Sequence, residues 1–376
     1  MAVFMPDFKI KNKIIFGAGG DCDDLIKMYP EVLSCAKYMV DNNPELWGKV
    51  KSGVPIKSPA ELKNENPSNV QIIVAMGAYY NVIPQIKSEG KFAMFFFHSK
   101  VWLNPFDTVV LDYKNVLLRI ETTSHCNLDC SFCNHGNMKR SKGNMEQELF
   151  EKIVMEAGKL GFKKLDIRNF GEPLLDKQLA ERIRFAKNNA FNDILLYTNA
   201  ILLSQSKYNE LADAGLDRIS ISLSPQKEYD ATRTAVSYSK IIEILKTLER
   251  KSKPKITIHI VSPESTDVEI SETVSLLNKM GYADVLRMHI HNWGVDSMSQ
   301  NLQKTTPCFR IWNSLTVLWD GRVSLCCIDY EGDYILGDLR KQNLSEVFNS
   351  KKYVNIRQQQ LDGDLPQICI ACTNFR

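Results

Sequence analysis

The sequence predicts an α/β protein in which six βα units form an open or curved parallel barrel. The main observation is a series of six strand candidates that alternate with amphipathic helical stretches. A second is a group of apolar runs before the barrel, the first of which leads into a glycine turn. A third is a change of pattern at the end of the chain, to a hairpin, a helix and a cysteine-bearing tail. We therefore predict a first domain, a linker, the barrel and an extension at residues 1–98, 99–114, 115–293 and 294–376.

Length and charge limit the possible partners. The 376 residues are enough for two or three domains, since a domain takes roughly 100–200 residues. Lys and Arg number 47 and Asp and Glu 44, so the net charge is +3 and no basic block predicts a nucleic-acid partner. The longest apolar run, "FAMFFF", is far shorter than the roughly 20 residues of a membrane span, and the start of the sequence lacks a secretion segment. These features predict a cytoplasmic protein with no membrane partner.

The first domain contains the buried-strand candidates "KIIF", "CAKYMVDNN", "NVQIIVAMGAYY" and "KFAMFFFHS". This pattern resembles a small Rossmann-like domain, and its glycine fingerprint is imperfect. Gly17 and Gly19 fit, Cys22 stands where a third glycine would pack the helix closely, and Asp41 is a candidate ribose acceptor. Sugar-nucleotide binding and a docking role without nucleotide therefore both stay open.

The barrel strands are predicted from short apolar runs bounded by turn residues. Between them lie amphipathic stretches such as "QELFEKIVMEAGKLG". The carboxyl ends of parallel strands meet at one edge, where this architecture places its chemistry. The six predicted strands are "NVLLRIETT", "KLDIRNFG", "DILLYTN", "DRISISLS", "KITIHIVSP" and "DVLRMHIHNW".

Three cysteines follow the first barrel strand with the spacing C-x3-C-x2-C, at Cys126, Cys130 and Cys133. The cytosol disfavours disulfides, so ten cysteines with seven in two groups indicate metal ligands or catalysts. Zinc sites usually pair their cysteines as two CxxC knuckles, whereas three thiolates suit an iron-sulfur cluster with one open iron. A zinc site completed by His125 or His135 is the alternative.

The stretch "CNLDCSFC" resembles the signature of the radical S-adenosylmethionine (SAM) superfamily, and later motifs follow in the family's order. "NFGEPLL" resembles its glycine-glutamate motif, "YTNA" its threonine-asparagine-glycine turn with Ala200 for glycine, and "ISLSP" its fourth-strand region with Ser224 for aspartate. The resemblance implies a partial (β/α)6 TIM-like barrel and a SAM-binding 4Fe-4S cluster held by the three cysteines. It also implies SAM contacts at Phe132, Gly171, Glu172, Thr198, Asn199, Ser222 and Arg233.

A second group of cysteines, Cys308, Cys326, Cys369 and Cys372, has the spacing C-x17-C-x42-C-x2-C. Four thiolates close a site completely, and sequence chemistry alone leaves an iron-sulfur cluster and a structural zinc both open. Gly321, placed for a hairpin turn, and the late CxxC resemble the auxiliary-cluster extension called SPASM, or Twitch in its one-cluster form. That resemblance implies one auxiliary 4Fe-4S cluster held by these four cysteines.

The resemblance implies a radical enzyme that takes a hydrogen atom from an unactivated C–H bond and needs a flavodoxin- or ferredoxin-type reductant. The ligand spacing and compact length resemble 2-deoxy-scyllo-inosamine dehydrogenase, which implies oxidation of a secondary alcohol on a sugar, cyclitol or sugar nucleotide in carbohydrate biosynthesis. A sugar epimerase and a SPASM-type peptide-modifying enzyme are the alternative enzymes. A zinc-binding regulator is the non-enzymatic alternative.

Other cysteines and histidines receive weaker assignments. Adjacent strand residues face opposite sides, so we expect Cys327 to turn away from a cluster bound by Cys326 and to have a structural role. If Cys327 instead faces the barrel mouth, it becomes the hydrogen donor of an epimerase. His259, His289 and His291 lie on late strands, where a histidine can take a hydroxyl proton, although core or rim positions are the commoner outcome. Cys22 and Cys35 are expected to be small buried hydrophobic residues.

Overall fold

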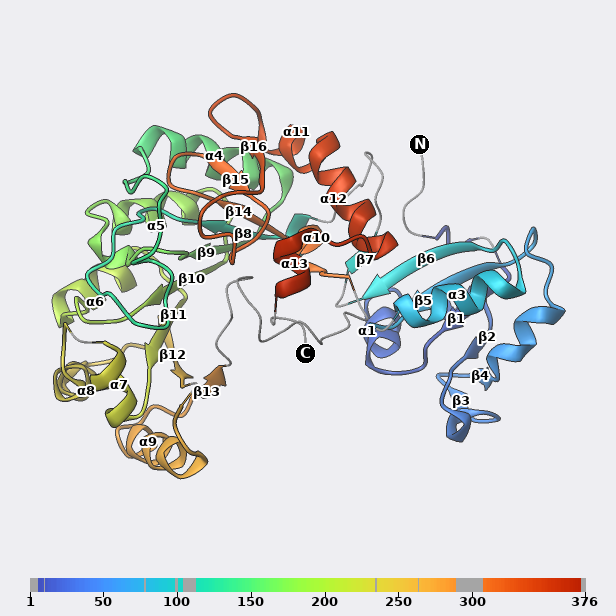
Figure 1. Ribbon diagram of the computed structural model, residues 1–376, viewed down its shortest axis with the longest axis horizontal. Coiled ribbons are helices and arrows are strands. Elements are labelled where there is room, and N and C mark those ends of the chain that lie inside the picture. Colours follow the sequence, from blue (N-terminus) through green and yellow to red (C-terminus); the bar gives the residue numbers. More distant parts are fainter. Residues whose placement is uncertain are drawn as a thin grey trace.

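The structure is a computed structural model, and it describes residues 6–9, 11–77, 79–98, 101–103, 113–233, 235–262, 264–288 and 307–372. The strands of the described residues form two sheets, one of seven strands and one of nine (Figure 1). No helix in the described part of the chain is long and apolar enough to cross a membrane.

The first sheet belongs to the N-terminal domain. Its elements are β1 (Lys13–Phe16), α1 (Gly20–Met28), α2 (Val32–Cys35), β2 (Ala36–Val40), β3 (Val50–Lys51), β4 (Val54–Lys57), β5 (Gln71–Ala75), α3 (Tyr79–Glu89), β6 (Ala93–His98) and β7 (Val101–Leu103). The strand order is β3-β4-β2-β1-β5-β6-β7. All four residues of β1 are buried, and β1 pairs in parallel with both β2 and β5. The four predicted strands and the Rossmann-like arrangement are therefore present.

The sequence prediction missed three short strands of this sheet. β3 and β7 pair antiparallel with β4 and β6 at the two edges. Strands of two to four residues contain too few side chains to show a period. Their existence depends on the neighbouring strand that supplies hydrogen bonds.

The second sheet begins with the six predicted barrel strands, which are all confirmed. In chain order the elements are β8 (Leu117–Ile120), α4 (Gln147–Leu160), β9 (Lys164–Ile167), α5 (Leu179–Asn188), β10 (Asp193–Thr198), α6 (Gln205–Asp213), β11 (Arg218–Leu223), α7 (Gln226–Thr232), α8 (Tyr238–Thr247), β12 (Lys255–Val261), α9 (Asp267–Lys279) and β13 (Val285–Met288). Every neighbouring pair from β8 to β13 is parallel. On α4 the buried positions recur at helical spacing, so one face of the helix packs on the sheet.

The C-terminal extension contains α10 (Arg310–Asn313), β14 (Ser314–Val317), β15 (Arg322–Ser324), β16 (Ile335–Asp338), α11 (Leu344–Phe348), α12 (Lys351–Asp362) and α13 (Gln367–Ala371). The predicted hairpin is confirmed as β14 and β15, with Gly321 at φ +88° in the turn. The single predicted helix is instead two helices. Ser350 begins the second one, because its side chain accepts a hydrogen bond from the backbone N–H of Tyr353 at 3.3 Å.

The extension is continuous with the barrel sheet. β14 pairs in parallel with β8, and the sheet order is β13-β12-β11-β10-β9-β8-β14-β15-β16. In Figure 1 the helices α10, α12 and α13 lie between the barrel and the N-terminal sheet, and α10 contacts β7. The ring of His98 also meets that of Phe309, with centroids 5.7 Å apart. The hairpin pairing brings the second cysteine group next to the barrel mouth.

Candidate active site

A cavity of about 300 Å³ opens at the carboxyl ends of β9, β10, β11 and β12. This volume lies at the lower end of the range for small-molecule sites. Cys126, Cys130 and Cys133 line it from the loop that follows β8, as the order of the strands predicted. The structure therefore brings the three cysteines of the first group to one cavity.

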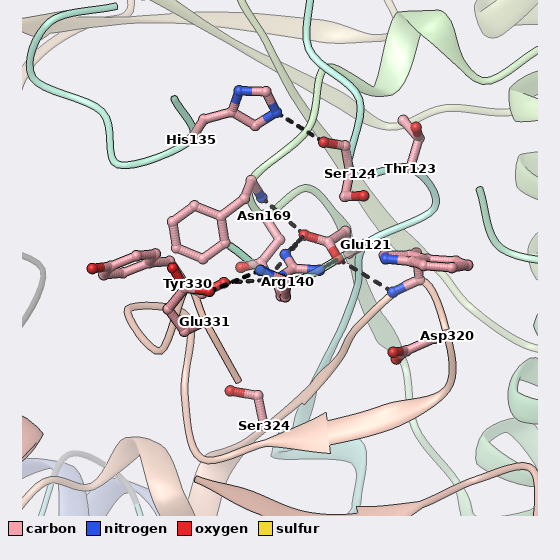
Figure 2. Close-up of polar contacts among 12 residues, drawn as sticks. Glu121, Thr123, Ser124, His135, Arg140, Asn169, Asp320, Ser324, Tyr330 and Glu331 are labelled. Carbon is pink, nitrogen blue, oxygen red and sulfur yellow. Dashed lines mark hydrogen bonds and ion pairs between the residues drawn. The ribbon is translucent and has the colours of Figure 1, made fainter. Parts of the chain in front are cut away.

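The histidines next to these cysteines do not complete a zinc site. His125 is exposed, and one ring nitrogen of His135, Nε2, lies 2.9 Å from the carbonyl oxygen of Ser124 (Figure 2). Among the residues that the structure describes, no group of three or more His, Cys, Asp or Glu side chains is arranged to hold a single metal ion. In an iron-sulfur cluster each thiolate binds a different iron, so its cysteines need not converge on one point.

The thiols of the first group are partly shielded from water. Burial raises the pKa of Cys126 and of Cys130 to about 11, and it raises the pKa of Cys133 as well. The thiols are therefore protonated at neutral pH in the free chain, and metal binding has to release their protons. Three thiols from one short loop fit a cluster that keeps one iron open.

Gly171 packs directly on the loop that leads to the first cysteine. A Cβ atom at this position would lie 2.0 Å from the carbonyl oxygen of Thr123, so only glycine fits. The next residue, Glu172, donates its backbone N–H to the carbonyl oxygen of His125 at 2.8 Å. The glycine-glutamate motif thus holds the cysteine loop in place.

The carboxylate of Glu172 joins the motifs of two strands. It accepts hydrogen bonds from Thr198 Oγ1 at 2.7 Å, from the backbone N–H of Asn199 at 2.8 Å and from that of Leu174 at 3.0 Å. Burial raises the pKa of this carboxyl group. Ala200, the residue after Asn199, has a φ of +61°. The turn therefore has the left-handed backbone conformation that favours glycine, although this sequence has alanine there.

Arg233 is buried between the fourth-strand region and the cysteine loop. It donates to Ser224 Oγ at 2.7 Å and to Ser222 Oγ at 3.1 Å, and its guanidinium lies 4.9 Å from the centre of the Phe132 ring. Ser224 therefore still binds the arginine although it replaces the usual aspartate. All seven predicted SAM contacts line the same cavity, namely Phe132, Gly171, Glu172, Thr198, Asn199, Ser222 and Arg233.

A second, smaller cavity contains the other cysteine group. Cys308, Cys326, Cys369 and Cys372 line it together with apolar side chains that include Ile311, Leu325, Ile328 and Ile368. The backbone N–H of Cys308 donates to the side-chain oxygen of Gln360, on α12, at 2.8 Å. Burial raises the pKa of Cys308 and of Cys326. Four thiols around an apolar space fit a fully ligated iron-sulfur cluster.

The orientation of Cys327 stays a prediction, but the reason given for it does not hold in the structure. β15 ends at Ser324, so Cys326 and Cys327 lie in a turn, where the alternation of strand side chains does not apply. Cys327 lines both the second cavity and the barrel-mouth cavity. Burial acts to raise the pKa of Cys327, but the guanidinium groups of Arg119, Arg168 and Arg310 outweigh it and lower the pKa to about 7.

A buried network that the sequence did not reveal connects the barrel to the extension (Figure 2). Glu121, fully buried after β8, accepts two hydrogen bonds from Arg140, at 2.6 and 3.0 Å. It also accepts one from the backbone N–H of Trp319 at 3.2 Å, while Arg140 Nε donates to the carbonyl oxygen of Tyr330 at 2.6 Å. Nothing in the local sequence distinguishes Glu121 from an exposed glutamate, because its partners are far along the chain.

The remaining predicted residues fall in different places. His259 lines the barrel-mouth cavity, where burial and the charge of Arg168 lower its pKa. His289 and His291 lie outside the described residues. Cys22 and Cys35 are buried as predicted, with Cys22 Sγ 3.9 Å from Met39 Sδ.

The glycine turn of the N-terminal domain is occupied by the chain's own groups. Asp41 accepts a hydrogen bond from the backbone N–H of Ala18 at 2.8 Å. Lys51 forms an ion pair with Asp23 at 2.8 Å, and Asp21 and Asp23 lie in the first turn of α1. Carboxylates at a helix N-terminus repel phosphate, so this arrangement disfavours a pyrophosphate there.

Comparisons with known proteins agree with these two cavities. Residues 120–277 match the family model of the radical SAM superfamily. Residues 308–373 match the model of the SPASM iron-sulfur cluster-binding domain. The first match contains the cysteine loop and the second contains all four cysteines of the second group.

Curated relatives match part of the chain. A GTP 3',8-cyclase of Clostridium botulinum (strain Hall) is 34% identical over 170 residues, which cover 43% of this chain and 52% of the relative. A probable GTP 3',8-cyclase of Methanothermobacter marburgensis is 37% identical over 112 residues, 30% of this chain and 36% of the relative. The chain thus spans about half the length of these relatives, or less.

Solved structures show a similar fold. BtrN in complex with AdoMet and 2-DOIA has a TM-score of 0.52 at 18% identity and covers 70% of this chain and 95% of BtrN. Streptococcus suis SuiB bound to the precursor peptide SuiA has a TM-score of 0.53 at 15% identity, covering 65% of this chain and 67% of SuiB. At these identities the likeness concerns the fold alone.

Proposed function

We propose that this chain is an enzyme that removes a hydrogen atom from a hydroxyl-bearing carbon of a carbohydrate-type small molecule. The chain carries a radical SAM domain followed by a SPASM domain. The two domains imply SAM, a 4Fe-4S cluster and an auxiliary iron-sulfur cluster. The observation that supports the proposal is one cavity lined by three cysteines and by every predicted SAM contact, which meets the second cysteine cavity at Cys327.

In this proposal Cys126, Cys130 and Cys133 hold the SAM-binding cluster. Cys308, Cys326, Cys369 and Cys372 hold the auxiliary one. Bound SAM supplies a 5'-deoxyadenosyl radical, which is strong enough to take a hydrogen atom from an unactivated carbon. The contribution of the chain is to orient the reactants and exclude water.

The polar residues of the cavity suit the binding of SAM. Glu172 is held by Thr198 and by the backbone of Asn199, so its carboxylate is fixed in place before any ligand arrives. The backbone of the glycine-glutamate motif, which these bonds hold next to the cysteine loop, suits the amino group of SAM, and the positive charge of Arg233 suits its carboxylate. Phe132 and Arg233 lie against each other in the wall of the cavity.

The position of Cys327 favours epimerisation as the outcome. A thiol in the same cavity can return a hydrogen atom to the substrate radical, on the face opposite to the one that lost it. The carbon gains a C–H bond and the sulfur is left as a thiyl radical. One electron from the flavodoxin- or ferredoxin-type reductant and one proton from water then restore the thiol.

Dehydrogenation is the second candidate, and a separate observation favours it. The cavity of the four cysteines adjoins the barrel-mouth cavity, so an electron acceptor there would be near the substrate radical. His259 lines the cavity and its lowered pKa leaves it neutral at pH 7, so it can take the hydroxyl proton. Loss of one hydrogen atom, one proton and one electron converts a secondary alcohol to a ketone.

The experiment uses the anaerobically reconstituted chain with SAM and dithionite. Candidate sugars, cyclitols and sugar nucleotides are scanned for release of 5'-deoxyadenosine, and GTP is included because the curated relatives are GTP 3',8-cyclases. In D2O an epimerase yields an isomeric product with one solvent deuterium, whereas a dehydrogenase yields a ketone without it. If the chain contains both clusters and no candidate stimulates 5'-deoxyadenosine release, the proposal fails.

Replacing Cys327 separates the two outcomes. Under epimerisation, Cys327→Ser still forms 5'-deoxyadenosine but no longer forms the isomer. Under dehydrogenation, the same variant keeps most of its ketone formation. Cys35→Ser, which changes a buried thiol of the N-terminal domain, is the matched control and leaves both products unchanged.

A further inference from the structure

Four polar side chains of the barrel-mouth cavity lie side by side in a row. None of the four is a predicted SAM contact. Arg168 directly follows β9, Tyr197 lies on β10, Ser220 on β11 and His259 on β12. Tyr197 and Ser220 are register partners on neighbouring strands, and Ile167, just before Arg168, pairs with Leu196, just before Tyr197. The polar row therefore crosses the floor of the cavity from strand to strand.

The four side chains contact one another along this row. The guanidinium of Arg168 lies 4.2 Å from the centre of the Tyr197 ring. The rings of Tyr197 and His259 have centroids 5.6 Å apart, and Ser220 Oγ lies 2.9 Å from His259 Nδ1. These contacts hold the row in place, and all four side chains still line the cavity.

Arg168 gives the floor of the cavity a positive charge, which Asp166 and the thiol of Cys327 stabilise from the protein side. Its Nε lies 3.7 Å from Asp166 Oδ2, and the same oxygen lies 3.7 Å from Nη2 of the buried Arg119. Two guanidinium groups thus share one carboxylate. The Arg168 side chain is only partly buried and lines the cavity, so an anion that enters the cavity can form a charge-assisted hydrogen bond with it.

The other charged side chains of the cavity have local partners. Glu172 is bound by Thr198 and the backbone of Asn199, and Arg233 by Ser222 and Ser224. Arg168, which also has protein partners, lines the part of the cavity beyond the predicted SAM contacts. Hydroxyl-binding groups, Ser220 and His259, stand next to it.

We propose that the polar row is the substrate subsite and that it binds a polyhydroxylated molecule with an anionic group, either a phosphate or a carboxylate. This inference rests on the function proposed above. Arg168 binds the anion in this arrangement. Ser220 and His259 hydrogen-bond hydroxyl groups, and the ring of Tyr197 packs on the apolar face of the sugar. A substrate with a protonated amine at this position would instead meet like charge.

The test measures ligand binding and needs no turnover. Anaerobic equilibrium dialysis of the reconstituted chain with SAM compares glucose with glucose 6-phosphate and with glucuronate, and adds UDP-glucose. At least one anionic probe is expected to bind about 10-fold or more tightly than glucose, as for a hydrogen-bonded ion pair. A preference for glucose 6-phosphate or UDP-glucose identifies a phosphate, and a preference for glucuronate identifies a carboxylate.

Variants assign the preference to Arg168. Arg168→Met is expected to abolish the difference between anionic and neutral probes, and Arg168→Lys to retain part of it. The control, Arg218→Met, removes a half-exposed arginine of the same barrel that pairs with Asp193, and it should bind like the unaltered chain. Equal or undetectable binding of anionic and neutral probes, or an unchanged preference in Arg168→Met, overturns the subsite.

A parallel measurement separates this inference from the proposed function. Dithionite-driven release of 5'-deoxyadenosine without any substrate tests the radical chemistry alone. Anion binding that depends on Arg168 in a chain that never cleaves SAM supports the subsite and overturns the function. SAM cleavage without such binding overturns the subsite and leaves the function standing.

Discussion

The two groups of cysteines occupy cavities of opposite character. The first group lines an open cavity whose other walls combine apolar side chains with polar ones such as Glu172 and Arg233. The second group lines a small cavity whose other walls are mainly apolar. Three thiols leave room for a ligand on the metal, whereas four thiols close the site. The first cavity can therefore admit a ligand beside its thiols, whereas the second encloses its thiols in a small space.

The largest expected effect comes from removing one thiol from each group. Cys130→Ala should abolish 5'-deoxyadenosine formation, because the open cluster loses a ligand, and should leave the second cluster in place. Cys369→Ala should lose the iron and sulfide of the second cluster while retaining SAM cleavage. Iron and sulfide analysis, electron paramagnetic resonance and product assays check both variants. SAM cleavage that survives in Cys130→Ala would contradict the comparison.

The next effect concerns the connection between the two sites. Glu121→Gln leaves the buried Arg140 without its carboxylate partner, so the free energy of unfolding should fall by about 3–5 kcal/mol. Urea unfolding measures this change. Glu146→Gln is the matched control, since the exposed Glu146 also pairs with an arginine of the extension, Arg340, and its replacement should lower the free energy of unfolding far less, because water screens an exposed ion pair. An equal decrease in the free energy of unfolding in the two variants would show that the buried network stabilises the protein no more than an exposed ion pair does.

The smallest effect concerns the support of the second site. Ser350 caps α12, the helix whose Gln360 accepts a hydrogen bond from the backbone of Cys308. Ser350→Ala should lower the free energy of unfolding by about 1 kcal/mol, as for other lost caps. It should lower iron content slightly, and only at the second site. Ser204→Ala, which removes the cap of a barrel helix, controls for the general cost of a lost cap.

Much of the candidate site could be predicted from short stretches of sequence. The three cysteines, Gly171 and Glu172 each stand directly after a predicted strand, so strand order alone placed them at one edge of the barrel. The prediction for Cys327 assumed that β15 continues through residue 327, whereas the strand ends at Ser324. The position of a strand end depends on hydrogen bonds from the neighbouring strand, which the local sequence does not contain.

The N-terminal domain shows the same limit. Its strands were predicted, and its glycine turn left nucleotide binding open. In the structure the carboxylate of Asp41 binds that turn through Ala18. In the sequence, an aspartate that binds a ribose looks the same as an aspartate that binds the protein's own backbone. Only the position of Asp41 in the folded chain distinguishes the two roles.

By itself the sequence determined the ligand types, their spacing and the order of the βα units, because these follow from residue chemistry and local periodicity. Only the tertiary structure decided that β14 pairs with β8, that Cys327 touches both cavities and that Glu121 binds Arg140 and Trp319. The contacts that join the barrel to the extension link residues nearly 200 positions apart, such as Glu121 and Trp319. No local pattern encodes such a partner, since the pairing forms only when the whole sheet closes and buries both groups.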